Sequence, residues 1–125
     1  MNRTVLLIED NEQNRYLATF LLEKHGFAVV AAADGLRGIE LAGTMAPAII
    51  LLDIQLPAMD GYAVARALRR NSALGKVPII AVTSYAMPGD REKAMDAGCD
   101  GYIEKPIDPD RFVDEILQFL PPEPS

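Results

Sequence analysis

Three carboxylates directly follow two short apolar runs of this sequence. The run TVLLI is followed by Glu9 and Asp10, and the run AIILL is followed by Asp53. Two unit charges about 4 Å apart repel each other by on the order of 4 kcal/mol at an effective dielectric constant near 20. If the two runs are neighbouring strands, the three carboxylates therefore need protons or a bound cation. A hard divalent ion suits oxygen ligands, and the residue types predict Mg2+.

Two further apolar runs also end in polar groups. VPIIAV is followed by Thr83, and GYI is followed by Glu104 and then Lys105. A carboxylate, a divalent ion, an ammonium group and a hydroxyl group around one point are what phosphoryl transfer to an aspartate requires. Asp53 would be the nucleophile, and the other groups would neutralise charge on the oxygens of the transferred group.

The elements that must position these groups follow a regular pattern of apolar runs. The runs do not alternate polar with apolar residues, so both faces of each strand should be covered, as in a parallel sheet. Segments with helical spacing lie between them, which gives a strand and a helix five times. Right-handed crossovers then build a three-layer α/β sandwich, with ligands beyond the carboxyl ends of the strands. The runs are residues 4–8, 28–33, 48–52, 77–82 and 101–103.

The expected helices carry apolar side chains at helical spacing, such as Phe20 in the first helix and Leu36 in the second. Glycines fall where helices should stop or turns begin, including Gly35. Asp108 followed by Pro109 is expected to cap the last helix, with the proline at the first helical position.

The composition indicates one folded domain and excludes several classes of protein. Half of the 125 residues are hydrophobic and 24% are charged, which is typical of a globular domain. Eighteen acidic residues against 12 basic ones give a net charge of -6, so nucleic-acid binding is not expected. A single cysteine, no signal-peptide pattern and no apolar run near 20 residues predict a cytoplasmic protein outside the membrane.

We expect the domain to span residues 1–120 and the Pro-rich tail to span residues 121–125. The tail PPEPS is either a terminus or the stub of a cut linker.

Four motifs together resemble the receiver, or response regulator, family of two-component signalling. They are VLLIEDN (5–11), LLDIQLPAMDG (51–61), AVTSYA (81–86) and GYIEKPI (101–107). The resemblance covers residues 4 to about 120. It implies a flavodoxin-like fold, with a parallel sheet of strand order 2-1-3-4-5.

The resemblance also implies roles for the acidic residues. Asp53 would be the phosphoacceptor. Glu9 and Asp10 would coordinate Mg2+ directly or through water, and the main-chain carbonyl of Gln55 would be a further ligand.

The remaining roles implied by the resemblance belong to the ends of the fourth and fifth strands. Lys105 would pair with the phosphoryl group, and Thr83 would hydrogen-bond to it. Tyr102 occupies the aromatic switch position and would turn inward when Thr83 moves. The peptide bond between Lys105 and Pro106 is expected to be cis.

Within the family, residues 82–108 look most like stand-alone receivers of the cell-cycle and polarity type, and like receivers of hybrid histidine kinases. We therefore expect a single-domain response regulator that is not an enzyme. A histidine kinase or histidine phosphotransfer protein would donate the phosphoryl group. A downstream protein would bind the face of the fourth helix, fifth strand and fifth helix, on a monomer or weak dimer.

Other interpretations stay open on the residues alone. The chain could be a receiver cut from a hybrid histidine kinase. A flavin- or nucleotide-binding module of the same fold class would need a phosphate loop, but EDNEQN (9–14) lacks glycine. A metal-dependent phosphatase would need a general acid near Asp53, and Gln55 cannot serve as one. Asp10 and Asp60 could instead be helix caps, and we favour that role for Asp60.

Overall fold

The computed structural model describes residues 3–56, 59–84 and 87–120. One parallel sheet has the strand order β2-β1-β3-β4-β5, so the predicted order is confirmed. The strands are β1 (Thr4–Ile8), β2 (Ala28–Ala32), β3 (Ile49–Asp53), β4 (Ile79–Thr83) and β5 (Gly101–Glu104). The helices are α1 (Glu12–Lys24), α2 (Gly35–Thr44), α3 (Gly61–Arg70), the short 3-10 helix η1 (Ser72–Leu74), α4 (Asp90–Asp96) and α5 (Phe112–Leu117).

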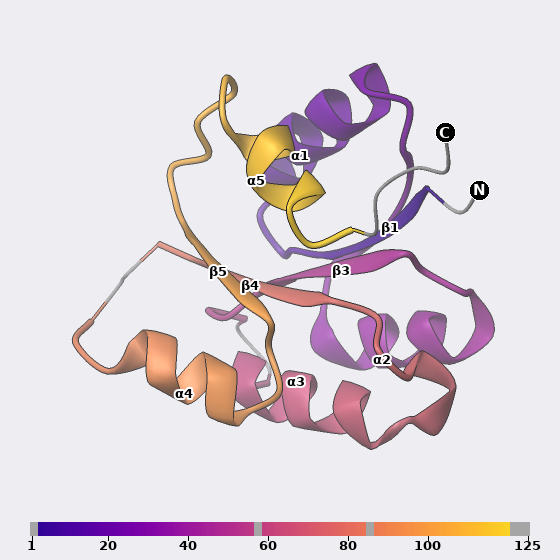
Figure 1. The fold of residues 1–125 in the computed structure, drawn as a ribbon, viewed down its shortest axis with the longest axis vertical. Helices are drawn as coiled ribbons and strands as arrows, with labels where there is room; N and C mark the ends of the chain where they lie inside the picture. The colour runs from indigo at the N-terminus through magenta and orange to yellow at the C-terminus, as the bar shows by residue number, and fades with distance from the viewer. Residues whose placement is uncertain (1–2, 57–58, 85–86, 121–125) are drawn as a thin grey trace.

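The helices cover the two faces of the sheet unequally. Figure 1 shows α1 and α5 on one face and α2, α3 and α4 on the other. This is the expected three-layer sandwich, and it explains why the central strands are apolar throughout. Leu6 and Ile50 lie in the core under α2 and α3, whereas Val5 and Ile49 lie in the core under α1 and α5. Successive residues of a strand point to opposite faces, so both kinds of position must be apolar here.

The outer strand β2 departs from the expectation that both faces are covered. Ala28 and Ala31 are exposed and only Ala32 is buried. β2 lies at the end of the strand order and pairs with β1 alone, so the helices do not enclose it as they enclose β3. The apolar run correctly predicted a strand at β2, but the expectation that both of its faces are buried was wrong.

The first two helices lie where the apolar spacing predicted them, although two of the apolar residues used for that prediction are open to solvent. Phe20 and Leu36 are 52% and 67% exposed, and Phe20 stacks on Tyr16 with 6.5 Å between ring centroids. Gly35 is the first residue of α2 and does not end an element.

The last helix begins later than the sequence predicted. α5 starts at Phe112, because Asp108 and Pro109 form a preceding turn. The Asp108 carboxylate accepts a hydrogen bond from the Asp110 N–H at 2.9 Å, and its carbonyl accepts one from the Phe112 N–H at 2.9 Å.

The register of the sheet brings the polar strand ends to one edge. Ile8 pairs with Leu52, Asp53 with Val82, and Thr83 with Glu104. Parallel strands in this register end side by side, so the residues that follow them share one space.

Among the described residues, no helix is long and apolar enough to cross a bilayer. The Pro-rich tail, residues 121–125, lies outside the described residues.

Candidate functional site

Asp53 is the last residue of β3 and is only 4% exposed. Its Oδ1 accepts a hydrogen bond from the main-chain N–H of Gln55 at 2.9 Å. This contact forms within the chain's turn after the strand, so the backbone itself orients the carboxylate. The side chain thus faces the common edge of the sheet.

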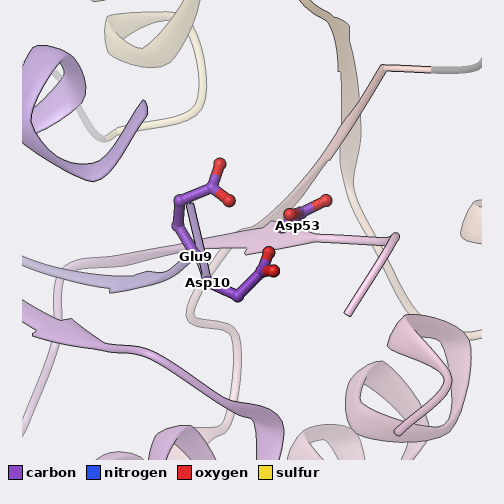
Figure 2. A group of neighbouring side chains, drawn as sticks. All are labelled: Glu9, Asp10 and Asp53. Atoms are coloured by element: carbon purple, nitrogen blue, oxygen red, sulfur yellow. The ribbon is translucent and has the colours of Figure 1, made fainter. Parts of the chain in front are cut away.

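Glu9 and Asp10 approach Asp53 from the end of β1. One carboxylate oxygen of each of the three residues lies within 4.8 Å of the others. Figure 2 shows the three carboxylates around one small volume beyond the strand ends. Glu9 is 4% exposed, whereas Asp10 is open to solvent. The predicted convergence of these residues is therefore present in the structure.

Two helices that begin near the site, α1 and α3, are each capped by a polar side chain. α1 is capped by Asn11, whose side chain accepts a hydrogen bond from the Asn14 N–H at 2.9 Å. The capping alternative for Asp10 was therefore wrong, because its neighbour performs that role. Asp60 caps α3 and accepts from the Tyr62 N–H at 3.0 Å, as expected.

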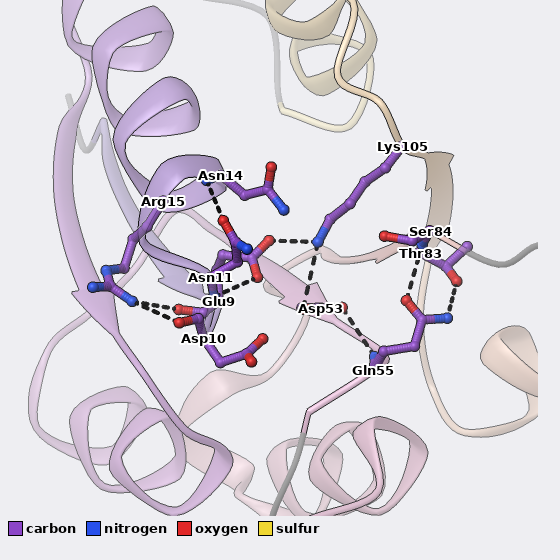
Figure 3. A network of polar contacts seen from close by, with 10 residues as sticks. All are labelled: Glu9, Asp10, Asn11, Asn14, Arg15, Asp53, Gln55, Thr83, Ser84 and Lys105. Atoms are coloured by element: carbon purple, nitrogen blue, oxygen red, sulfur yellow. Dashed lines mark hydrogen bonds and ion pairs between the residues drawn. The ribbon is translucent and has the colours of Figure 1, made fainter.

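The loop that carries Glu9 and Asp10 is held from α1 by Arg15. The Arg15 guanidinium donates to the main-chain carbonyls of Glu9 and Asp10, at 3.0 and 3.3 Å (Figure 3). The main-chain N–H of Asn11 also donates to the Glu9 carboxylate at 3.2 Å. Sequence reasoning missed Arg15. The only available signal was an arginine in the first turns of the helix that follows the acidic pair.

Lys105 is the one lysine among the residues drawn in Figure 3. Its Nζ lies 2.6 Å from the Glu9 Oε1 and 3.4 Å from the Asp53 Oδ2, and its side chain is 8% exposed. Its main-chain N–H donates to the Thr83 carbonyl at 2.7 Å, and the Lys105-Pro106 peptide bond is cis. The buried lysine thus lies between two carboxylates from different strands.

Burial raises the pKa of the Asp53 carboxyl above its ordinary value of 3.8. The neighbouring Glu9 carboxylate raises it further, while the Gln55 N–H and the Lys105 charge lower it. When ionised, three carboxylates oppose one ammonium group here. A hard divalent cation would remove this imbalance, and the donor set consists of the oxygen ligands that Mg2+ prefers. The residues therefore fit a magnesium site.

Thr83 lies at the end of β4 and is 2% exposed. The side-chain amide of Gln55 donates to the Thr83 hydroxyl oxygen and accepts a hydrogen bond from the Ser84 N–H at 2.9 Å. Sequence reasoning assigned Gln55 only through its carbonyl and gave its side chain no role. A polar residue two positions after Asp53 was the sole signal.

Tyr102, in β5, packs against the core under α2, α3 and α4. Its hydroxyl oxygen is buried and has no hydrogen-bond partner within the described ranges. Burial raises the pKa of the Tyr102 hydroxyl, and the charges of Asp90 and Glu104 add to this effect. The nearby Thr83 side chain and Arg91 oppose it.

A groove of about 420 Å3 lies on the outer side of β5. Arg91 contributes from α4, Tyr102 and Glu104 from β5, and Glu115 from α5. The groove thus carries both signs of charge beside an aromatic ring.

Comparisons with known proteins agree with this geometry. The family model described as the response regulator receiver domain matches residues 5–117. The polar-differentiation response regulator DivK of Brucella ovis is 40% identical over 96% of this chain and 98% of its own length, and DivK of Brucella abortus strain 2308 is equally similar.

Solved structures give the same picture. The Vibrio cholerae chemotaxis protein CheY4 has a TM-score of 0.91 at 25% identity, covering 96% of this chain and all of that one. The receiver domain of the Pseudomonas aeruginosa sensor histidine kinase PA1611, solved with a magnesium ion coordinated in its active-site cleft, has a TM-score of 0.84 at 36% identity. That match covers 94% of this chain and 96% of the other.

Proposed function

Because this chain belongs to the response regulator receiver family, we propose that it accepts a phosphoryl group on Asp53. Mg2+-dependent phosphorylation of an aspartate is the general function of receivers. One observation carries the assignment to this residue: the buried Asp53 carboxylate faces Glu9, Asp10 and Lys105 at one sheet edge.

The phosphoryl group would come from a phosphohistidine of a histidine kinase or a histidine phosphotransfer protein. A carboxylate oxygen of Asp53 forms the new P–O bond while the donor's P–N bond breaks, and the histidine nitrogen keeps the electron pair. Lys105 pairs with the phosphoryl oxygens, and the Thr83 hydroxyl donates a hydrogen bond to them. Both contacts lower the energy of negative charge on the transferred group.

Glu9, Asp10, Asp53 and the carbonyl of Gln55 would hold Mg2+. Bound there, the ion neutralises charge on the carboxylates and on the phosphoryl oxygens. The cluster of three carboxylate oxygens and the magnesium in the cleft of the PA1611 receiver support this assignment.

The output of the switch would be protein binding at the face made by α4, β5 and α5. The groove beside β5, with its mixed charges and the Tyr102 ring, supports this choice. Tyr102 would turn inward when Thr83 moves toward the phosphoryl group. The Tyr102 ring both lines this groove and packs against the core under α2, α3 and α4, which supports its role as the side chain that moves.

In this proposal the domain spans residues 1–120 and is a signalling domain rather than an enzyme. It acts in the cytoplasm as a monomer or weak dimer. The near-complete match to DivK supports a regulator of the polarity type. The 36% identity to the PA1611 receiver favours, as second candidate, a receiver that is part of a hybrid histidine kinase.

Intact-mass spectrometry after incubation with a small acyl phosphate and Mg2+ tests the assignment. The parent should gain one phosphoryl group, and Asp53→Asn should gain none. Asp34→Asn is the matched control, because Asp34 lies outside the cluster of three carboxylates and caps α2, and asparagine also caps helices. A phosphoryl adduct on Asp53→Asn, or equal labelling of the parent in excess chelator, would contradict the proposal.

A further inference from the structure

The side chain of Gln55 joins the ends of two neighbouring strands. Its amide nitrogen donates to the hydroxyl oxygen of Thr83, and its amide oxygen accepts from the main-chain N–H of Ser84 at 2.9 Å. Figure 3 shows both contacts beside Asp53, whose other neighbours there are the Lys105 ammonium group and Glu9. Gln55 lies in the turn that follows β3. From there it holds the last residue of β4, Thr83, and the next residue, Ser84.

The two contacts use both polar atoms of the Gln55 side-chain amide. A glutamine amide has a donor nitrogen and an acceptor oxygen, and here each meets a group of the opposite kind. An apolar side chain of the same length can make neither contact. Gln55 itself is exposed, so packing does not require a glutamine at this position.

We propose that the Gln55 side chain is a latch that holds Thr83 and Ser84 in the unmodified arrangement and must open when the switch operates. The inference rests on the proposed function, because Thr83 is the group that would move toward the phosphoryl group on Asp53. Gln55 is a positioning residue in this proposal. It acts on the phosphoryl group through Thr83.

A latch of this kind sets the population of the switched conformation before phosphorylation. A ligand that requires the switched conformation binds with an apparent affinity reduced by the fraction of protein in that conformation. Opening the latch removes two hydrogen bonds, and their loss changes such an equilibrium roughly fivefold to a hundredfold. Removal of the amide should therefore tighten binding of a phosphoryl analogue.

The test uses Gln55→Met, which keeps the length of the side chain and removes both hydrogen bonds. Binding of beryllofluoride with Mg2+ is measured by isothermal titration calorimetry. Exchange of the Ser84 amide hydrogen is measured by NMR without beryllofluoride. We expect roughly fivefold tighter beryllofluoride binding and at least about tenfold faster exchange of the Ser84 amide. Gln13→Met, at an exposed glutamine of α1, should change neither.

A double-mutant cycle with Thr83→Val separates the latch from other effects of the substitution. Valine lacks the hydroxyl that Gln55 holds, so Gln55→Met should change beryllofluoride affinity much less in that background. Equal or weaker binding by Gln55→Met than by the parent would overturn the latch, because the amide would then support the switched arrangement. Failure of the parent to bind beryllofluoride with Mg2+ would instead overturn the proposed function.

Discussion

The ammonium group of Lys105 lies closer to Glu9, at 2.6 Å, than to Asp53, at 3.4 Å. The lysine proposed to bind the phosphoryl group therefore pairs, in this structure, mainly with a proposed metal ligand. Both carboxylates and the ammonium group are nearly inaccessible to solvent. Lysine and metal thus share the task of compensating the same buried negative charges, which makes their effects on stability interdependent.

Removal of the lysine charge should destabilise the protein most strongly without metal. Lys105→Gln leaves Glu9 and Asp53 buried without their cation, and we expect a loss of about 3 kcal/mol in the free energy of unfolding. Saturating Mg2+ should reduce this loss, because the ion compensates the same carboxylates. Urea unfolding with and without Mg2+ measures both values. The exposed Lys76→Gln is the control, and identical losses in the two conditions would contradict shared compensation.

Stability and metal binding should depend on pH through Asp53. Its pKa is raised in the folded state, so ionising it opposes folding as the pH rises through that raised value. Without metal, Asp53→Asn should therefore melt at a higher temperature than the parent at pH 7. The difference should vanish as the pH falls below the ordinary pKa of 3.8.

Magnesium should reverse this order at neutral pH. Mg2+ at 100 times its dissociation constant should stabilise the parent by about 3 kcal/mol, and Asp53→Asn by less. The gain should shrink toward acid pH, because protons compete with the ion for the carboxylates. Differential scanning calorimetry with Mg2+ or with chelator measures these effects. A magnesium gain that is independent of pH between 7 and about 4 would be inconsistent with a carboxylate site.

Arg15 should be required for tight metal binding although it carries the wrong charge to be a ligand. Arg15→Met removes two hydrogen bonds that hold the Glu9 and Asp10 carbonyls. We expect about tenfold weaker Mg2+ binding, typical of losing a group that orients ligands. Calorimetric titration with Mg2+ provides the measurement. Arg70→Met, at an exposed residue of α3, should leave the affinity unchanged. Tighter binding by Arg15→Met would mean that charge repulsion outweighs positioning.

Gly61 should be needed for the close approach of α3 to the turn after Asp53. A Cβ at Gly61 would lie 2.5 Å from the Ile54 Cα and 2.6 Å from the Ile54 carbonyl oxygen. Gly61→Ala should therefore cost about 2 kcal/mol of stability, because backbone atoms must move apart. The matched change Gly43→Ala, at an exposed position within α2, should stabilise by about 0.5 to 1 kcal/mol. Thermal unfolding compares the two, and equal effects would contradict the steric account.

Residue order was enough to predict the architecture and the edge of the sheet that carries the site. Apolar runs such as residues 48–52 are too short for a buried helix and too continuous for a half-exposed strand, so they specified a parallel sheet. Polar residues at the ends of these runs must then meet at one edge, because parallel strands end together. The placement of Glu9, Asp10 and Asp53 at this edge follows from this rule, and their convergence follows because the first and third strands are neighbours.

Tertiary structure decided which side chains contact one another at that edge. The sequence did not reveal that Lys105 favours Glu9, that Arg15 holds two carbonyls, or that the Gln55 amide reaches Thr83 and Ser84. It also did not predict the exposure of β2, which depends on the strand's place at the end of the sheet. Periodicity reports the direction of a side chain relative to its own element. Contacts across 28 residues of chain depend on rotamers and on the spacing between elements, which arise only when the chain is folded.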